Sequence, residues 1–357
     1  MSRWIFGVVL LMMVTGLSHM VEAQTVRGRL VGADADVPVS GALVSLEDSA
    51  GVSVAQMVTG SAGRFGLRAP MPGRYHLQVR RIGFHPWSTE VVLAAGEELV
   101  RTVSLSDLPV ALPEIRVAGT SVCGERFRGD TLSAALWSQA GTALEITRHT
   151  VESRAYRFET LREEQEIARV GATAPVTRLH ELSISAWPVQ APPAATLLAN
   201  GFVENIEDIQ VGPTWYGPDA EFLLSDPFFE GHCFRAVPPD PVMPPEWVGL
   251  AFEPAVRDAR ADIRGTLWLD RETGQLRRLN FEYTRIPKWA RGSEATGELR
   301  FAPLPDGGWI VQQWRIRVPV PRVDLGTRQA SLYGFRESFG RVTAVLATNG
   351  ALLQRYP

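Results

Sequence analysis

The sequence predicts a mainly β protein in which an N-terminal β-sandwich is followed by an α+β domain with a curved antiparallel sheet. Short apolar runs in residues 25–105 alternate with Gly, Pro and Asp turns about every ten residues, the spacing typical of a sandwich or barrel. In the C-terminal half, apolar residues alternate along runs joined by Gly-containing turns, as in antiparallel hairpins. Between these regions, apolar residues recur at three- and four-residue spacing, which predicts one helix.

Length and charge limit the function classes. The 357 residues are long enough for two or three domains with separate cores, and we expect two. The formal net charge of -3 provides no positive field that would attract nucleic acid. We therefore expect no nucleic-acid partner.

Residues 1–23 have the features of a secretory signal peptide. Arg3 provides a basic start, residues 5–17 are apolar, and residues 21–23 end in the small-residue pattern of a cleavage site at Ala23. The apolar run has about 13 residues, whereas a helix needs roughly 20 to cross a bilayer, so an uncleaved anchor is the less favoured alternative. We expect export to the periplasm or outer membrane and no transmembrane segment after cleavage.

Residues 25–105 contain the strands of the predicted sandwich. We expect this stretch to fold on its own, because it holds a full set of strands for two packed sheets. The predicted strands are residues 26–31, 42–46, 64–67, 75–79, 90–93 and 100–105.

The turn residues of this stretch identify a family. Residues 38–44 (PVSGALV), 59–65 (TGSAGRF), 72–75 (PGRY) and 81–84 (RIGF) resemble the carboxypeptidase regulatory-like domain, a transthyretin-like or carbohydrate-binding-like seven-strand sandwich. One position departs from the family pattern, because Gly60 stands where an acidic residue usually follows the threonine. The resemblance implies a fold and an extracytoplasmic setting, and no particular reaction.

A linker and a helix follow the sandwich. Residues 106–130 begin with a Pro-containing extended strip, similar to the junction that leads into the plug of TonB-dependent outer-membrane receptors. The rest of the chain is too short for the barrel of such a receptor. Asp130 or Thr131 is a good N-cap for a helix over residues 132–147, in which Gly141 costs about 1 kcal/mol relative to alanine.

Residues 131–357 are predicted to form one domain of helix and antiparallel sheet. Residues 156–160 alternate as a strand, although residues 159–170 could instead form a polar helix. A second alternating run covers residues 177–186, and residues 195–202 form a helical turn. The later predicted strands are residues 265–269, 279–283, 299–301, 309–318, 332–335 and 342–346.

The hairpin over residues 265–283 is similar to the half-barrel of periplasmic lipoprotein-carrier (LolA-like) proteins. The similarity lies in the order of strands and turns over residues 247–318. Because the concave face of those proteins holds acyl chains, a face lined by Leu267, Leu279 and Phe281 would indicate a lipid-like ligand. Exposed tryptophans beside acids would instead indicate a sugar.

A zinc site is the first candidate for chemistry. His149 and Glu152 form the His-x-x-Glu pair that zinc carboxypeptidases use. A catalytic zinc needs a third protein ligand, and His180 or His232 could supply it by position, although no surrounding sequence supports either. We interpret the pair as a solvated histidine and glutamate just past a helix end, and we expect no metal, no cofactor and no catalytic residue.

Calcium and sugar sites are weaker candidates. Asp34 and Asp36 could bind calcium, but two acids in a loop between strands more often form a turn. Tryptophans could stack on sugars, although packing in a core or at its rim is their commoner role. The tryptophans in question are Trp87, Trp215, Trp268 and Trp289.

Cys123 and Cys233 are the 2 cysteines of the chain. Because the signal peptide directs the protein to an oxidising compartment, we predict one disulfide between them. The bond would tie the linker and the helix to the sheet. The alternative is two thiols that are buried separately.

These observations favour a secreted, non-catalytic binding or interaction protein of the periplasm or outer membrane. Its partner would be a protein, a glycan or a lipid-like ligand at the cell envelope. Three alternatives stay open: a carrier of a lipid-like ligand in the C-terminal sheet, a carbohydrate-binding protein and, least favoured, a metal-dependent hydrolase.

Overall fold

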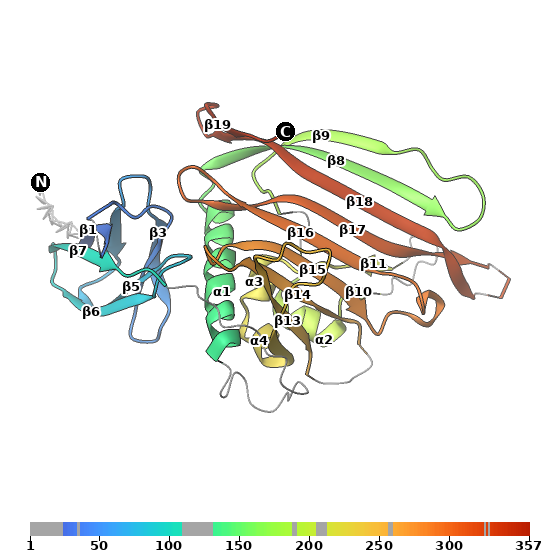
Figure 1. Ribbon diagram of the computed structural model, residues 1–357, viewed down its shortest axis with the longest axis horizontal. Helices are drawn as coiled ribbons and strands as arrows, with labels where there is room; N and C mark the ends of the chain where they lie inside the picture. The colour runs from blue at the N-terminus through green and yellow to red at the C-terminus, as the bar shows by residue number, and fades with distance from the viewer. Residues whose placement is uncertain are drawn as a thin grey trace, which may run out of the picture.

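The computed structural model describes residues 24–33, 36–108, 131–187, 191–204, 213–255, 260–324, 326–327 and 329–357. They form an N-terminal sandwich and a larger unit built on one sheet (Figure 1). The predicted signal peptide and most of the predicted linker lie outside these residues. Within the described part of the chain, no helix is both long and apolar enough to span a membrane.

Two sheets form the sandwich. The first has the strand order β4 (Arg64–Ala69), β1 (Gln24–Gly32) and β7 (Glu98–Leu105), with β1 antiparallel to β4 and parallel to β7. The second has the order β3 (Ser53–Val58), β2 (Leu43–Glu47), β5 (Gly73–Arg80) and β6 (Trp87–Leu93). The predicted sandwich is therefore confirmed. Strand β3 was not predicted, because apolar and polar residues do not alternate in its sequence, SVAQMV.

Strand β4 shows why the sandwich was predictable. Phe65, Leu67 and Ala69 are buried, whereas Arg64 and Arg68 are exposed. Side chains of a strand point to opposite faces in turn, so this alternation places one apolar face on the core and one polar face in solvent.

The larger unit is a curved antiparallel sheet of ten strands. Its central path begins at edge strand β12 (His232–Val237) and ends at edge strand β9 (Thr177–Ser183). The strands between them, in spatial order, are β13 (Trp247–Pro254), β14 (Asp262–Asp270), β15 (Leu276–Thr284), β16 (Thr296–Pro303), β17 (Trp309–Val323), β18 (Ala330–Ala347) and β8 (Tyr156–Ala168), and β19 (Leu352–Arg355) pairs with β18.

Helix α1 (Thr131–Glu152) lies between the sandwich and the large sheet (Figure 1). Its buried residues lie on one broad face, and among its residues only Thr131 and Glu152 at the two ends are exposed, which is typical of a helix enclosed by other elements. Shorter elements complete the unit. They are α2 (Ala194–Asn200), α3 (Ala220–Leu223), α4 (Asp226–Gly231), η1 (Lys288–Ala290) and the β10 (Val203–Glu204) and β11 (Thr214–Trp215) pair.

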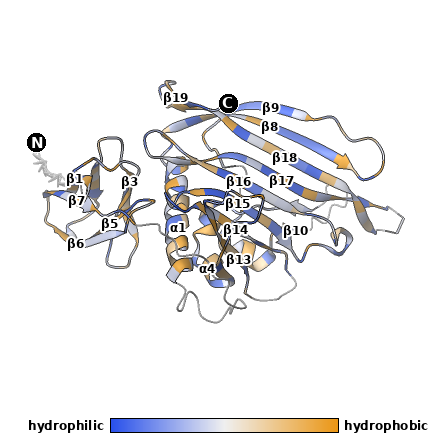
Figure 2. Cartoon of the chain, in the orientation of Figure 1, coloured by the Kyte–Doolittle hydropathy of each residue, from blue (hydrophilic) through white to orange (hydrophobic). Residues whose placement is uncertain are grey.

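The two faces of the large sheet differ in chemistry. Leu267, Leu279, Leu299 and Trp314 lie opposite one another on successive strands and belong to one apolar core together with residues of α1. The residues next to these along the strands, such as Asn280, Glu298 and Gln313, carry polar side chains on the other face. This alternation is visible along β16, β17 and β18 in Figure 2. The apolar face is therefore the one that α1 covers.

Two sequence expectations for this unit need correction, and one is confirmed. The helix continues to Glu152, five residues beyond its expected end at Thr147, because its last turn packs against the start of β17. The strand predicted from Tyr156 is confirmed as β8, which pairs with both β18 and β9, so the alternative helix over residues 159–170 is not formed. The two strands expected over residues 332–335 and 342–346 are one continuous strand of 18 residues.

Candidate functional site

The zinc pair lies in the last turn of α1. Burial lowers the pKa of the His149 imidazole, and the Glu152 carboxylate only partly offsets this. The two histidines considered as a third zinc ligand lie on opposite edge strands, His180 on β9 and His232 on β12. Among the described residues, no group of three or more His, Cys, Asp or Glu side chains could hold a metal ion. The pair is within the helix rather than past its end, which corrects that detail of the prediction.

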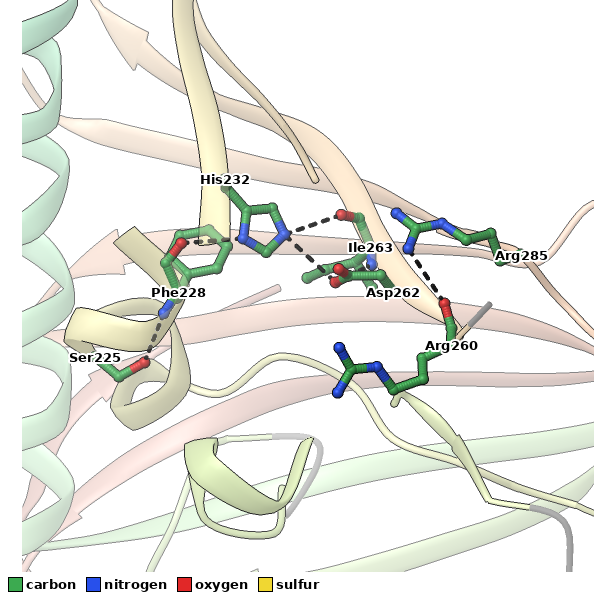
Figure 3. A network of polar contacts seen from close by, with 7 residues as sticks. All are labelled: Ser225, Phe228, His232, Arg260, Asp262, Ile263 and Arg285. Atoms are coloured by element: carbon green, nitrogen blue, oxygen red, sulfur yellow. Dashed lines mark hydrogen bonds and ion pairs between the residues drawn. The ribbon is translucent and has the colours of Figure 1, made fainter. Parts of the chain in front are cut away.

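His232 has a buried structural environment (Figure 3). Its side chain is inaccessible, with Nδ1 3.0 Å from the Phe228 carbonyl oxygen and Nε2 3.3 Å from the Ile263 carbonyl oxygen. Nε2 also lies 3.4 Å from the Asp262 carboxylate. Ser225 accepts a hydrogen bond from the Phe228 backbone N–H and so caps α4. The imidazole therefore joins α4 to the beginning of β14.

Glu152 lines a pocket of about 340 Å³ at the end of α1. Asp219 and Glu221 also line it, whereas His149 does not. Burial raises the pKa of Asp219, although its carboxylate accepts a hydrogen bond from the Phe222 backbone N–H and caps α3. The structure thus separates the two members of the zinc pair into different environments.

The tryptophans considered for sugar binding lie on four different elements, β6, β11, β14 and η1. Trp268 is buried and offers no open face. Trp87 packs against the sandwich core, and Trp215 packs edge to face on Tyr283 at 5.2 Å between ring centroids. Packing accounts for these three rings, and sugar binding stays a hypothesis.

The apolar face considered for a lipid is already covered. Leu267, Leu279 and Phe281 are buried in the core that includes Leu136 and Leu144 of α1. A lipid that contacted these side chains would have to displace the helix.

Two sequence candidates fall partly outside the described residues. Asp36 lies in the loop between β1 and β2 with a φ of 48°, whereas Asp34 is not described. Cys233 is buried in β12, and Cys123 lies outside the described residues. The calcium site remains a weak hypothesis, and the disulfide stays a prediction.

The junction between the sandwich and the large unit brings together residues that are distant in sequence. The Gly83 backbone N–H donates to Gln139 Oε1 on α1 at 2.7 Å. Arg80 Nη2 lies 2.5 Å from Glu145 Oε2, also on α1. These contacts fix the end of β5 and the following turn against the helix.

Apolar packing reinforces this junction. Leu43 and Ile82 belong to the sandwich by sequence but are buried in the core of the large unit. Gly41 and Gly307 approach so closely that a Cβ atom on Gly41 would lie 3.2 Å from the Gly307 Cα. Both glycines have positive φ angles, 70° and 97°, which residues with a side chain rarely adopt. The two units are thus in direct backbone contact.

A pocket of about 620 Å³ opens at this junction, and we call it the junction pocket. The sandwich contributes Arg81 and the turn around it, and the large unit contributes the β14–β15 turn, α1 and the start of β17. Ile82, Ile146 and Leu304 form apolar parts of its lining. Ligand sites occur preferentially at such domain junctions.

Arg81 is the cationic group of the junction pocket. Its Nε donates to the Ser40 carbonyl oxygen at 2.7 Å, its Nη1 donates to the Ile82 carbonyl oxygen at 3.3 Å, and its guanidinium lies 4.4 Å from the Phe84 ring centroid. Burial lowers the pKa of this guanidinium, and the Asp107 carboxylate only partly offsets this. The cation is therefore held in place and partly desolvated.

Trp309 is also among the residues that line the junction pocket, although it is only 4% exposed. Its backbone N–H donates to Thr150 Oγ1 on α1 at 3.1 Å. Its indole Nε1 is buried and has no hydrogen-bond partner among the described residues. Buried hydrogen-bond donors are normally paired, so an unpaired indole N–H beside a pocket suggests that its partner comes from outside the described residues.

Sequence reasoning did not single out the junction pocket. The RIGF turn at residues 81–84 was recognised as a family feature, but it gave no sign of a partner surface. Trp309 was expected only as the start of a strand. The pocket arises from contacts between segments more than 200 residues apart, and no local pattern reports these.

The comparison with known families supports the family resemblance found in the sequence of the sandwich. Residues 25–106 match the carboxypeptidase regulatory-like domain. This is less than a quarter of the 357-residue chain. No curated protein matches the chain.

Solved structures show distant likenesses. A minor pilin of Streptococcus agalactiae has 17% identity and a TM-score of 0.22, with 28% of this chain and 49% of the pilin covered, so this chain spans about half of it. The 5-hydroxyisourate hydrolase of Klebsiella pneumoniae has 22% identity and a TM-score of 0.20, with 23% of this chain and 90% of the hydrolase covered. A putative membrane-associated protein of unknown function from Bacteroides fragilis has 13% identity and a TM-score of 0.18, with 90% of this chain and 97% of that chain covered. At these scores the likenesses carry no argument about function.

Proposed function

We propose that this protein is a non-catalytic binding protein of the cell envelope, and that it takes its ligand at the junction pocket. The sandwich acts in this proposal as a fixed positioning module. Its role is to supply one wall of the site, including the Arg81 guanidinium.

The observation that carries this proposal is the shared core of the two units. Leu43 and Ile82 of the sandwich are buried among residues of α1 and the large sheet. A merely tethered module would expose these side chains to water, at a cost of about 1.5 to 3 kcal/mol for each large aliphatic side chain. Burial at the junction therefore favours one fixed arrangement and one persistent pocket.

A lipid-carrier function at the inner face of the large sheet is the weaker alternative. The resemblance to lipoprotein carriers rests on the order of strands and turns, and the curved sheet with an apolar face fits that order. Occupation of that face by α1 argues against it. A metal-dependent hydrolase is weaker still, since the described residues bring no third ligand to His149.

Location and the disulfide complete the proposal. The N-terminal sequence pattern supports secretion, and the family of the sandwich fits an extracytoplasmic setting. In that compartment a bond between Cys123 and Cys233 would attach the linker to edge strand β12.

Native mass spectrometry of the full chain, purified gently from the periplasm, tests the proposal. We expect one copurifying small molecule, recovered with unchanged mass. Glu272→Trp provides the matched variant, because Glu272 lines the pocket with an exposed side chain that a tryptophan would replace by a plug. A ligand retained equally by this variant, or one converted to product by the protein, would contradict the proposed function.

A further inference from the structure

The junction pocket has the chemistry of a site for a specific ligand class. We propose that it binds a small apolar molecule carrying a single carboxylate, with the carboxylate at Arg81 and an oxygen that meets the Trp309 indole N–H after a local movement of the pocket lining. This inference rests on the proposed function, because it names the ligand of the same pocket.

Arg81 provides the positive charge that would bind the carboxylate. Two of its guanidinium nitrogens already donate to backbone carbonyl oxygens, at 2.7 Å and 3.3 Å. Nη2 has no hydrogen bond or ion pair with any described residue. The neighbouring Asp107 influences the guanidinium electrostatically but is exposed. A partly buried cation whose remaining N–H groups are unused is suited to accept an anion, because guanidinium groups bind carboxylates through fixed, directed hydrogen bonds.

The indole N–H of Trp309 provides a hydrogen-bond donor in the lining of the same pocket. It is a donor and cannot accept, so its missing partner must be an acceptor atom. The side chain is nearly inaccessible, and Thr150 holds its backbone in place. Because Nε1 is itself buried, a ligand oxygen would reach this donor only after a local movement of the side chains that line the pocket.

The surrounding charges distinguish a carboxylate from a phosphate. Asp107 and Glu272 both line the pocket with exposed side chains. Their negative charges oppose a multiply charged anion more strongly than a monoanion. A single carboxylate matches the single cation.

The walls define the rest of the ligand. Phe84, Leu108 and Pro305 present accessible apolar surface from the RIGF turn, from the segment after β7 and from the β16–β17 turn, whereas Ile82, Ile146 and Leu304 in the lining are buried. A pocket of about 620 Å³ is within the size range of sites for small organic molecules. The body of the ligand should therefore be apolar.

Three probes of equal chain length test the ligand class on the full mature protein: octanoate, octan-1-ol and octylamine. Titration at neutral pH, followed by NMR, should give the order octanoate, octanol, octylamine. We expect octanoate to bind about ten- to a hundredfold more tightly than octanol, since hydrogen bonds to charged groups contribute about 1.5 to 3 kcal/mol. Equal affinities for octanoate and octanol, or no binding of octanoate, would overturn the inference.

Substitutions locate the effect. Arg81→Met keeps an apolar stem and should reduce the affinity for octanoate to that for octanol. Trp309→Phe keeps the ring without the donor and should weaken octanoate binding severalfold. Arg101→Met, on an exposed part of β7, is the control and should change nothing. If Arg81→Met does not fold, the three probes on the unmodified protein still decide.

The outcome also separates this inference from the proposed function. If Glu272→Trp abolishes binding of octanol and octanoate alike while the two bind equally well, the pocket is a binding site and the carboxylate preference is wrong. If Glu272→Trp leaves octanoate binding intact, the site itself is wrong.

Discussion

The sandwich and the large sheet cover their apolar faces in different ways. In the sandwich, two sheets of similar size enclose a core that includes Leu46 and Leu77. In the described part of the chain, no second sheet of similar size packs on the large sheet, and α1 with shorter helices and the β10–β11 pair covers its apolar face. The sandwich is thus complete by local pairing, whereas the large sheet depends on a helix that precedes it in the chain and on a contact with the sandwich.

This difference indicates where function can reside. A sandwich that closes its own core leaves its turns available for other contacts, and the RIGF turn packs on the large unit. The junction pocket lies where those turns meet the covered sheet. Substitutions in the core of the sandwich and substitutions in α1 should therefore have different effects on stability.

The largest expected effect comes from the helix. Leu144→Ala should lower the free energy of unfolding by about 2 to 5 kcal/mol, because the side chain is fully buried in the core of the large unit. Amide exchange should accelerate in β13 to β17 and stay slow in the sandwich. Leu46→Ala, equally buried in the sandwich core, is the matched control and should give the reverse pattern. A loss below about 1 kcal/mol for Leu144→Ala would show that the sheet does not need the helix.

The predicted disulfide should stabilise the large unit only slightly less. Cys233→Ser should cost about 2 to 4 kcal/mol if the bond to Cys123 forms, since it closes a loop of about 110 residues. Alkylation of the native, unreduced and then denatured protein should detect no thiol by mass spectrometry. Two alkylated cysteines under those conditions would rule the bond out.

The ion pair across the junction should have a smaller effect. Arg80 and Glu145 are 29% and 19% exposed, so solvent screens them only partly. A double-mutant cycle with Arg80→Met and Glu145→Gln should give a coupling of about 1 kcal/mol. The pair Arg74–Glu90 on the sandwich surface is 74% and 50% exposed and should give about half of this or less. Equal coupling energies would indicate that solvent screens the ion pair at the junction as strongly as the ion pair on the sandwich surface.

The smallest expected effect is a pH dependence at the end of α1. Burial lowers the pKa of His149 in the folded protein, so the unfolded chain binds more protons at mildly acidic pH. His149 should therefore contribute stability at pH values above about 6.5 that is lost progressively as the pH falls. Urea titrations at pH 7.5 and 5.5 should show a smaller pH difference for His149→Gln than for the unmodified protein. An unchanged difference would mean that His149 is not responsible.

The sequence allowed the sandwich to be predicted well because strand alternation and turn residues are local. In β4, for example, the pattern follows directly from the order of Phe65, Leu67 and Ala69. The length of α1 was underestimated, because Thr150 is polar yet buried against Trp309. Strand β18 was divided into two because the intervening residues, such as Arg336 and Glu337, are charged, and their partners lie on β8 and β17.

The junction pocket was not predictable for the same physical reason. The importance of Arg81 comes from burial and from the carbonyl groups around it, and neither is encoded by its neighbours in sequence. The same holds for Trp309, because only the folded protein shows that its indole N–H lacks a hydrogen-bond partner among the described residues.

The central claim is that the sandwich is fixed on the large unit, and one amide reports this directly. The Gly83 N–H donates across the junction to Gln139 Oε1. Hydrogen exchange measured by NMR on the full chain should show that this amide exchanges far more slowly than in an unfolded peptide, and that Gln139→Ala removes most of the protection. Exchange of the Gly83 amide at the unfolded rate in the unmodified protein would show that the sandwich is only tethered, and that the junction pocket does not persist.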